Sequence, residues 1–158
     1  MLTYKQKLAF IARIAPLAQA SQSKYGVPAS ITIAQAIKES AWGQSPLALR
    51  ANNFFGIKVR TRQSYAEFDS TRFRQAHGAR GELNRFRKFR SAAQCFDTHA
   101  RLLASIPKYQ AVMKHMGDPV LFASLLQRTY AKSPDYAIDL VRDIGDFELE
   151  KYDKREVA

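Results

Sequence analysis

The sequence contains a single cysteine, Cys95, and this excludes an intramolecular disulfide and any zinc site built from several cysteines. Histidine is scarce as well. His77, His99 and His115 lie far apart in the chain and do not have the spacing of metal ligands. We therefore expect neither a metal nor a cofactor.

Long apolar runs are also missing, since the longest fall far short of the roughly 20 residues that a membrane-spanning helix needs. The N-terminal stretch "MLTYKQKLAFIARIAPLAQA" has apolar residues at helical spacing. Lys5, Lys7 and Arg13 interrupt it, whereas a signal peptide has an unbroken apolar core. We expect a chain that is made in the cytoplasm without a Sec signal peptide and does not insert into membranes.

Acidic residues are few compared with basic ones. Twenty-five Lys and Arg against fourteen Asp and Glu give a net charge of +11. Such a surplus implies attraction to an acidic polymer, which could be nucleic acid, anionic lipid or the anionic bacterial cell wall. Charge alone does not choose among these partners.

The chain is suited to one domain covering residues 1–158. Its 158 residues are 46% hydrophobic, and a chain of roughly this length buries about two-thirds of the surface that it exposes when unfolded. Seven Gly and six Pro are scattered, and neither a low-complexity segment nor an internal repeat is visible.

The first part of the chain has helical patterning. It predicts a helix over residues 4–24, kinked or divided at Pro16, and a second helix from about Pro28 to Ala41. Apolar residues form one stripe of this second helix, and Glu39 projects on another side. A short helix is expected in "SPLALRA", after the break at Gly43.

The middle of the chain is different, because residues 55–89 are rich in aromatics and Arg, and "SYAEF" and "RFRKF" alternate as strands do. Helical signals then return. Helix starts are predicted at a capping box of Ser91 and Gln94, at Asp118, and at Ser133-Pro134-Asp135. The expected fold class is mainly α (α+β), a helical domain with a small β-hairpin lobe flanking a cleft.

The stretch "AQAIKESAWGQSPLALRANNFFGIK" resembles the signature of the glucosaminidase domains of flagellar peptidoglycan hydrolases, autolysins and some phage lysins, glycoside hydrolase family 73. Two further segments are similar to that family, in the same order along the chain: "RFRKFRSAAQCFDTHARLL" and "TYAKSPDYA". The resemblance covers about residues 8–145. It implies a lysozyme-like fold and endo-hydrolysis of the β-1,4 bond after N-acetylglucosamine in peptidoglycan.

The resemblance places the general acid at Glu39. Glycosidic cleavage needs a carboxyl group that stays protonated near neutral pH, and partial burial among apolar side chains raises a carboxyl pKa in the required direction. A solvated glutamate on the polar side of a helix is the alternative reading of the spacing alone.

The second carboxylate departs from the family pattern. Family members usually carry another Glu in the strand lobe, but the corresponding stretch "STRFRQ" has Arg72 at that position. Glu67 is our first candidate for the missing group, ahead of Asp69 and Glu82. The acetamido group of the substrate could instead act as the nucleophile, with Arg72 holding it or a neighbouring carboxylate.

Several other residues are candidates for contacts with the sugar. The resemblance assigns Tyr130 to the catalytic site and Tyr136 to substrate binding. Aromatic stacking and amide hydrogen bonding suggest further substrate contacts, from Trp42, Asn53, Phe54 and Phe55. Packing in the core, or a turn at Asn53, would also explain these residues.

Alternatives to this function remain open. A lytic transglycosylase or a muramidase can use one Glu on the same fold, and a peptidoglycan-binding protein could lack catalysis. A nucleic-acid-binding module is suggested by the charge and by "RFRKFR" at residues 85–90. We expect the partner to be the peptidoglycan glycan strand, with no specific nucleic acid. We also expect a monomer that acts in the periplasm or on the cell wall, after non-Sec export or lysis.

Overall fold

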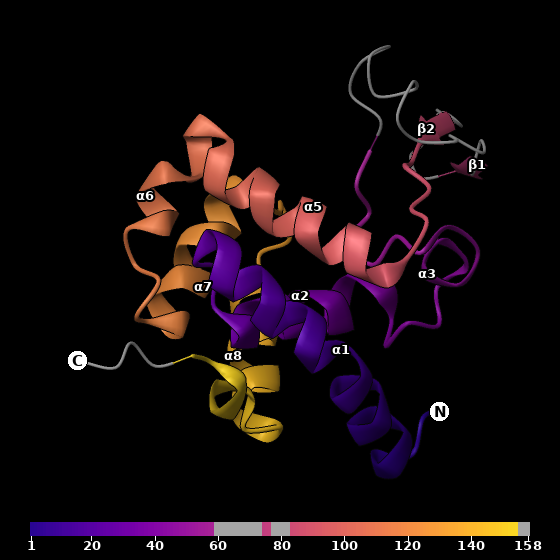
Figure 1. Ribbon diagram of the computed structural model, residues 1–158, viewed down its shortest axis with the longest axis horizontal. Coiled ribbons are helices and arrows are strands. Elements are labelled where there is room, and N and C mark those ends of the chain that lie inside the picture. The colour runs from indigo at the N-terminus through magenta and orange to yellow at the C-terminus, as the bar shows by residue number, and fades with distance from the viewer. Residues whose placement is uncertain (59–73, 77–82, 155–158) are drawn as a thin grey trace.

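The protein is described by a computed structural model that places residues 1–58, 74–76 and 83–154. Figure 1 shows a mainly helical molecule, which confirms the helical fold class. The α-helices are α1 (Tyr4–Tyr25), α2 (Ala29–Ser40), α3 (Pro46–Ala51), α5 (Ala92–Ser105), α6 (Gln110–Met113), α7 (Pro119–Thr129) and α8 (Tyr136–Asp146). The 3-10 helices are η1 (Pro107–Tyr109) and η2 (Leu149–Tyr152). None of the described helices is both long and apolar enough to cross a bilayer.

Helix α1 is continuous, so of the two outcomes predicted at Pro16, a kink or a division, the division is wrong. Thr3 and Gln6 form a capping box at its start, and Gly26, in a left-handed conformation, ends it. Pro16 cannot donate a hydrogen bond to the Ala12 carbonyl. Both residues are exposed, so water can hydrate that carbonyl and the helix continues.

Helix α2 lies at the centre of the fold. It packs against α1, α7, α8 and η2, and all of its residues from 29 to 37 are buried. The sequence predicted a single apolar stripe on this helix. The structure buries nearly its whole circumference instead, because neighbours surround it. Glu39 lies at its C-terminal end, where this cover stops.

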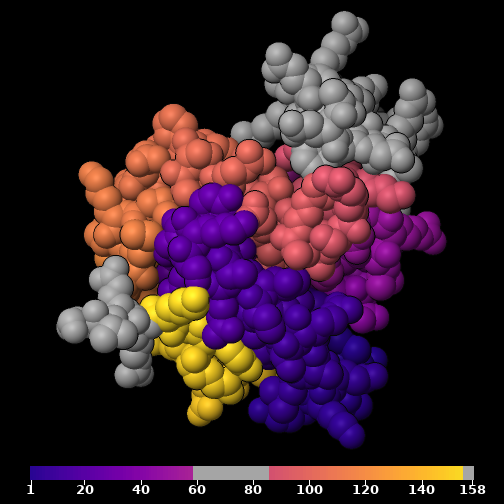
Figure 2. Space-filling model, viewed as in Figure 1, coloured from indigo at the N-terminus to yellow at the C-terminus, as the bar shows by residue number. Residues whose placement is uncertain are grey.

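The N-terminus of α2 is capped from the far end of the chain. Pro28 offers no capping side chain, and Asp153 takes over: its carboxylate oxygens accept hydrogen bonds from the backbone N–H and the hydroxyl of Ser30, both at 2.7 Å. The amide of Gln19 on α1 donates to the carbonyl of Tyr152 at 3.1 Å. Figure 2 shows the C-terminal segment, in yellow, lying against α1.

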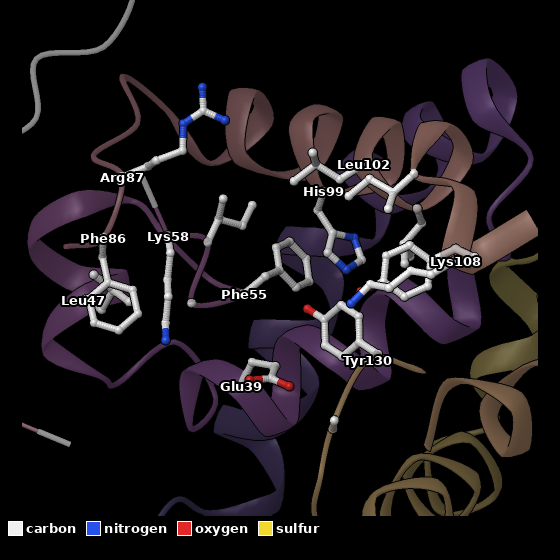
Figure 3. A pocket seen from close by; sticks show the side chains of 16 residues that line it. Glu39, Leu47, Phe55, Lys58, Phe86, Arg87, His99, Leu102, Lys108 and Tyr130 are labelled. Atoms are coloured by element: carbon white, nitrogen blue, oxygen red, sulfur yellow. The ribbon is translucent and has the colours of Figure 1, made fainter. Parts of the chain in front are cut away.

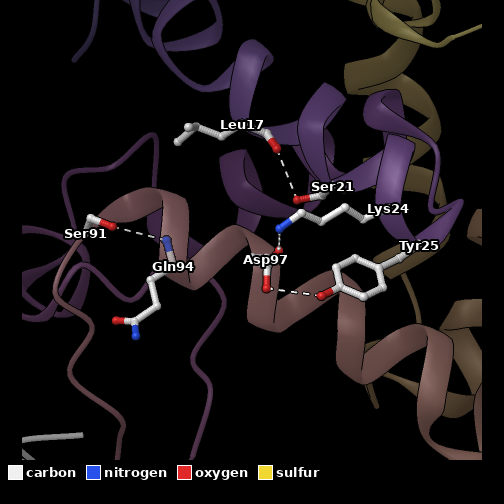
Figure 4. Close-up of polar contacts among 7 residues, drawn as sticks. All are labelled: Leu17, Ser21, Lys24, Tyr25, Ser91, Gln94 and Asp97. Carbon is white, nitrogen blue, oxygen red and sulfur yellow. Dashed lines mark hydrogen bonds and ion pairs between the residues drawn. The ribbon is translucent and has the colours of Figure 1, made fainter. Parts of the chain in front are cut away.

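Helix α5 packs along α1. Asp97 joins the two, since it accepts from the Lys24 ammonium at 2.6 Å and from the Tyr25 hydroxyl at 3.2 Å (Figure 4). This pairing aligns α5 with the N-terminal helix, and it leaves the opposite side of α5 to face the pocket described below.

Two predicted helix starts are confirmed in detail. The Ser91 hydroxyl accepts from the N–H of Gln94 at 3.2 Å, and Asp118 accepts from the N–H of Leu121 at 3.0 Å. The capping box at Ser91 differs in one respect, because the Gln94 side chain accepts from the N–H of Arg90 and not from that of Ser91.

The described strands are short. β1 (Arg74–Ala76) and β2 (Leu83–Arg85) pair antiparallel, with Gln75 opposite Asn84. Of the predicted strand "RFRKF", only its first residue lies in β2. Phe86 forms an isolated bridge with Lys58. The predicted strand "SYAEF" lies outside the described residues.

Candidate active site

A pocket of about 860 Å³ opens beside the end of α2 (Figure 3). Five parts of the chain contribute to its wall: the end of α2, helix α3 with the segment after it, the segment after β2, helix α5 with η1, and the loop after α7. Of the sequence-predicted site residues, it brings together Glu39, Phe55 and Tyr130.

The break that follows Glu39 has a left-handed backbone. The three residues with positive φ are Ala41 (49°), Trp42 (60°) and Gly43 (73°). The hydroxyl of Ser40 accepts from the N–H of Gly43 at 2.7 Å and closes the turn. A Cβ at Gly43 would lie 2.7 Å from a ring carbon of Phe10, so only glycine fits there. The Trp-Gly break therefore stops α2 abruptly and leaves Glu39 at the pocket.

Glu39 is a carboxyl group with a raised pKa. Its side chain reaches solvent through the pocket, but the surrounding protein atoms partly desolvate the carboxylate, and this burial raises its pKa above the usual value. A hydrogen-bond interaction with Tyr136 and the charge of Lys38 oppose the rise. Lys38 is itself paired with Asp139, which weakens its effect on Glu39. The net direction is the one that a general acid requires.

Two tyrosines lie beside Glu39. The rings of Tyr130 and Tyr136 stack with centroids 5.7 Å apart. Tyr136 is buried and its hydroxyl accepts a 2.8 Å hydrogen bond from the Gln35 amide, whereas Tyr130 lines the pocket. Burial, together with the nearby Glu39 charge, raises the pKa of both phenols, so both stay protonated as hydrogen-bond donors.

The two phenylalanines after Asn53 have different surroundings. Phe55 lines the pocket and its ring stacks on His99, with centroids 3.8 Å apart. Phe54 lies in the core, where its ring packs edge-on against Phe96 at 5.6 Å. Of these two rings only Phe55 reaches the pocket wall, and at 4% exposure it presents little surface there.

Trp42 faces away from this pocket. Its ring packs edge-on against Phe147 at 5.1 Å and against Phe10 at 6.0 Å, and the Lys7 ammonium lies 5.1 Å from its centroid. Trp42 lines a separate hollow of about 370 Å³. Its packing stabilises the left-handed turn after α2. This structural role explains the tryptophan that follows the end of the helix.

Asn53 has a structural role in the described chain. Its amide nitrogen donates to the carbonyls of Ile57 and Arg87, both at 2.9 Å, and its oxygen accepts from the N–H of Ile57 at 3.0 Å. The side chain is 1% exposed. These bonds fix the loop that carries Phe55. The Asn53 amide is therefore not free to make the predicted contact with the acetamido group of the substrate.

His99 also lines the site, although it was not among the residues predicted from the sequence. It is 2% exposed, lines the pocket, and packs between Phe55 and the edge of Tyr130, whose centroid lies 6.0 Å away. Within the described residues neither ring nitrogen has a hydrogen-bond partner. Burial lowers its pKa to about 3, so the imidazole is neutral. His99 lies four residues after Cys95 and four before Leu103, so the three residues share one buried stripe of α5. This spacing was the signal in the sequence that could have identified His99.

The remaining predicted residues cannot be placed. Glu67 and Arg72, together with Asp69 and Glu82, lie outside the described residues, and their roles stay predictions. In the part of the chain that the structure describes, no cluster of three or more His, Cys, Asp or Glu side chains could hold a metal ion.

Comparisons with known proteins identify the family of the chain. The family "Mannosyl-glycoprotein endo-beta-N-acetylglucosaminidase" (Glucosaminidase) matches residues 15–149. The exo-glucosaminidase LytG of Bacillus subtilis is 35% identical over 152 residues, which are 92% of this chain and 53% of LytG. The peptidoglycan hydrolase FlgJ of Pseudomonas aeruginosa is 33% identical over 134 residues, 81% of this chain and 34% of FlgJ.

Solved structures share the fold. The catalytic domain of the autolysin Auto from Listeria monocytogenes has a TM-score of 0.78 and 25% identity, covering 97% of this chain and 90% of that structure. The chain spans about half of LytG and a third of FlgJ. Because the family match covers most of its length, the chain belongs to the glucosaminidase family of glycoside hydrolases.

Proposed function

We propose that the protein is an endo-β-N-acetylglucosaminidase that hydrolyses the β-1,4 bond after N-acetylglucosamine in bacterial peptidoglycan, with Glu39 as general acid. The observation that carries the proposal is the position of Glu39, a carboxyl with a raised pKa, in a pocket of about 860 Å³. Pockets of about 300 to 1,000 Å³ are typical of small-ligand sites.

The chemistry follows from that position. As the glycosidic bond breaks, charge develops on the leaving oxygen, and a protonated Glu39 supplies the proton. Tyr130, which lines the same pocket, is the second catalytic group that we propose, as a hydrogen-bond donor to the substrate. Phe55 contributes apolar surface to the pocket wall.

We propose that a hairpin lobe completes a lysozyme-like cleft and carries the partner carboxylate, Glu67, with Arg72 beside it. An inverting reaction would need this carboxylate about 6.5 to 9.5 Å from Glu39, so that water fits between. Substrate assistance needs no such group. Single alanine variants at 67, 69 and 82 decide between them, because loss of the base costs about 100-fold or more in rate. Three near-normal rates would contradict the two-carboxylate mechanism.

The experiment for the function is a digest of purified wall sacculi followed by mass spectrometry of the products. Reducing N-acetylglucosamine ends on products of mixed length support the endo-glucosaminidase. Release of single terminal sugars would indicate exo-cleavage, the activity in the name of LytG. Anhydromuramic ends would indicate a transglycosylase, and reducing muramic ends a muramidase.

Glu39→Gln belongs in the same experiment. Its product yield should fall by about 100-fold or more, because an amide cannot deliver a proton. Glu150→Gln, at an exposed glutamate of η2, is the matched control and should cleave like the parent. If the parent protein left the glycan intact, we would conclude that it is a wall-binding protein without catalysis.

The nucleic-acid alternative loses its main support. Phe86 and Phe89 of "RFRKFR" are 8% and 1% exposed, so they do not form a stacking surface for bases. We propose that the wall glycan is the partner, bound by a monomer that acts in the periplasm or on the wall.

A further inference from the structure

The pocket beside Glu39 carries more positive than negative charge. Lys58, Arg87 and Lys108 line it, and Glu39 is the only acidic side chain among the described residues of its wall. A general acid works in its neutral form, so these cations are not needed to balance a charge on Glu39. The charges of Lys58 and Lys108 are available to a ligand.

Lys58 and Lys108 lie on different sides of the pocket. Figure 3 shows them on either side of Phe55, with Glu39 across the pocket between them. The N–H of Arg87 donates a 2.9 Å hydrogen bond to the carbonyl of Ile57, and Lys58 forms a β-bridge with Phe86. These contacts hold the backbone of Lys58 in place. Lys108 comes from η1, and its ammonium donates to the carbonyl of Thr129 at 3.0 Å.

Neither lysine has an acidic partner. Within the described residues, Lys58 and Lys108 form no ion pair with Asp or Glu. Lys38, next to Glu39 in sequence, is different because Asp139 neutralises it. Both lysines are exposed, as solvated lysines are, but they line one pocket from two separate segments of the chain.

We propose that Lys58 and Lys108 select glycans whose sugars carry carboxylates on both sides of the cleaved N-acetylglucosamine. This inference rests on the proposed function. In peptidoglycan, muramic residues alternate with N-acetylglucosamine, so each cleaved unit has a lactyl-bearing neighbour on either side. The lactyl group, or the peptide stem attached to it, presents carboxylate. A neutral N-acetylglucosamine polymer of the same linkage lacks these groups.

The experiment compares two ligands of nearly the same shape, of which only one is charged. One is the peptide-free tetrasaccharide of two N-acetylglucosamine–N-acetylmuramic acid units with free lactyl carboxylates; the other is the same tetrasaccharide with those carboxylates converted to amides. Their affinities are measured by calorimetry in the Glu39→Gln background at fixed ionic strength. Since this variant is expected to cleave at least about 100-fold more slowly, binding is separated from turnover. A third ligand that bears a dipeptide stem distinguishes lactyl from stem carboxylates.

We expect the acid form to bind at least about fourfold more tightly than the amide, and Lys58→Met or Lys108→Met to lower that ratio about two- to fivefold each, within the range of exposed ion pairs. Lys5→Met removes the same charge from exposed α1 and is the control. Equal affinity for both forms, or a ratio unchanged by both pocket variants, would overturn the inference and leave glycan cleavage standing. Binding of neither form would overturn both the inference and the proposed function.

Discussion

Gln35 and Tyr136, 101 residues apart in the chain, are joined by a buried 2.8 Å hydrogen bond from the Gln35 amide to the Tyr136 hydroxyl. Gln35 lies one turn before Glu39 on α2, and Tyr136 begins α8. The bond orients the phenol toward Glu39. The Tyr136 hydroxyl lowers the pKa of Glu39, whereas burial raises it. Two helices from opposite ends of the sequence thus set the acidity of one carboxyl group.

Tyr136→Phe should therefore shift the alkaline limb of the kcat/KM profile to higher pH. Without the phenol, the pKa of Glu39 rises further, and the protonated acid persists at higher pH. Stability should fall by about 1 to 3 kcal/mol, because the buried Gln35 amide loses its partner. The measurement is the pH dependence of wall hydrolysis. Tyr25→Phe removes a phenol far from the pocket and should leave the limb in place.

Local chemistry was readable from the sequence, and this covers most helix starts and the end of α2. Ser91 and Asp118 cap their helices because capping depends on residues three positions apart. The neighbours of an aromatic ring, in contrast, could not be predicted from the local sequence. Trp42 and Phe55 were both expected at the sugar, but packing from α1 and the C-terminal segment turns Trp42 away. That choice depends on contacts distant in sequence, as does the placement of His99.

Replacing Glu39 by Gln should leave the free energy of unfolding at pH 7.5 unchanged or higher. A carboxyl whose pKa is raised on folding binds its proton more tightly in the folded state, so ionisation above its usual pKa costs stability. Any advantage of Gln should disappear near pH 4, where the unfolded chain also holds the proton. Urea denaturation at both pH values measures this. A large loss of stability at pH 7.5 would instead make Glu39 a structural residue.

Acid should destabilise the protein through His99. The folded imidazole has a pKa of about 3, whereas the unfolded one takes up a proton below its usual 6.5, so stability is lost as pH falls through this window. Between about pH 7.5 and pH 5 the loss from this group is about 2 kcal/mol. His99→Leu should flatten the dependence by that amount. Exposed His115→Gln is the control. An unchanged slope in His99→Leu would refute the assignment.

The long-range cap on α2 gives the last prediction. Asp153→Ala removes both 2.7 Å hydrogen bonds to Ser30 and leaves only the 3.3 Å bond from the N–H of Ala29 to the Gln22 side chain, which should cost about 2 kcal/mol. Asp135 is the matched control: it stands at the N-cap of α8 but its side chain makes no capping hydrogen bond, so Asp135→Ala should change stability far less.

Urea denaturation measures the cost of each substitution, and amide hydrogen exchange locates it. In Asp153→Ala, exchange should accelerate first at the N-terminal turn of α2, because Ser30 loses its acceptor there. Asp153→Asn, which keeps an acceptor for the Ser30 N–H, should recover part of the loss. If Asp135→Ala proved as costly as Asp153→Ala, the cap would not be the cause. Loss at Asp153 alone would mean that the C-terminal segment stabilises the helix that carries Glu39.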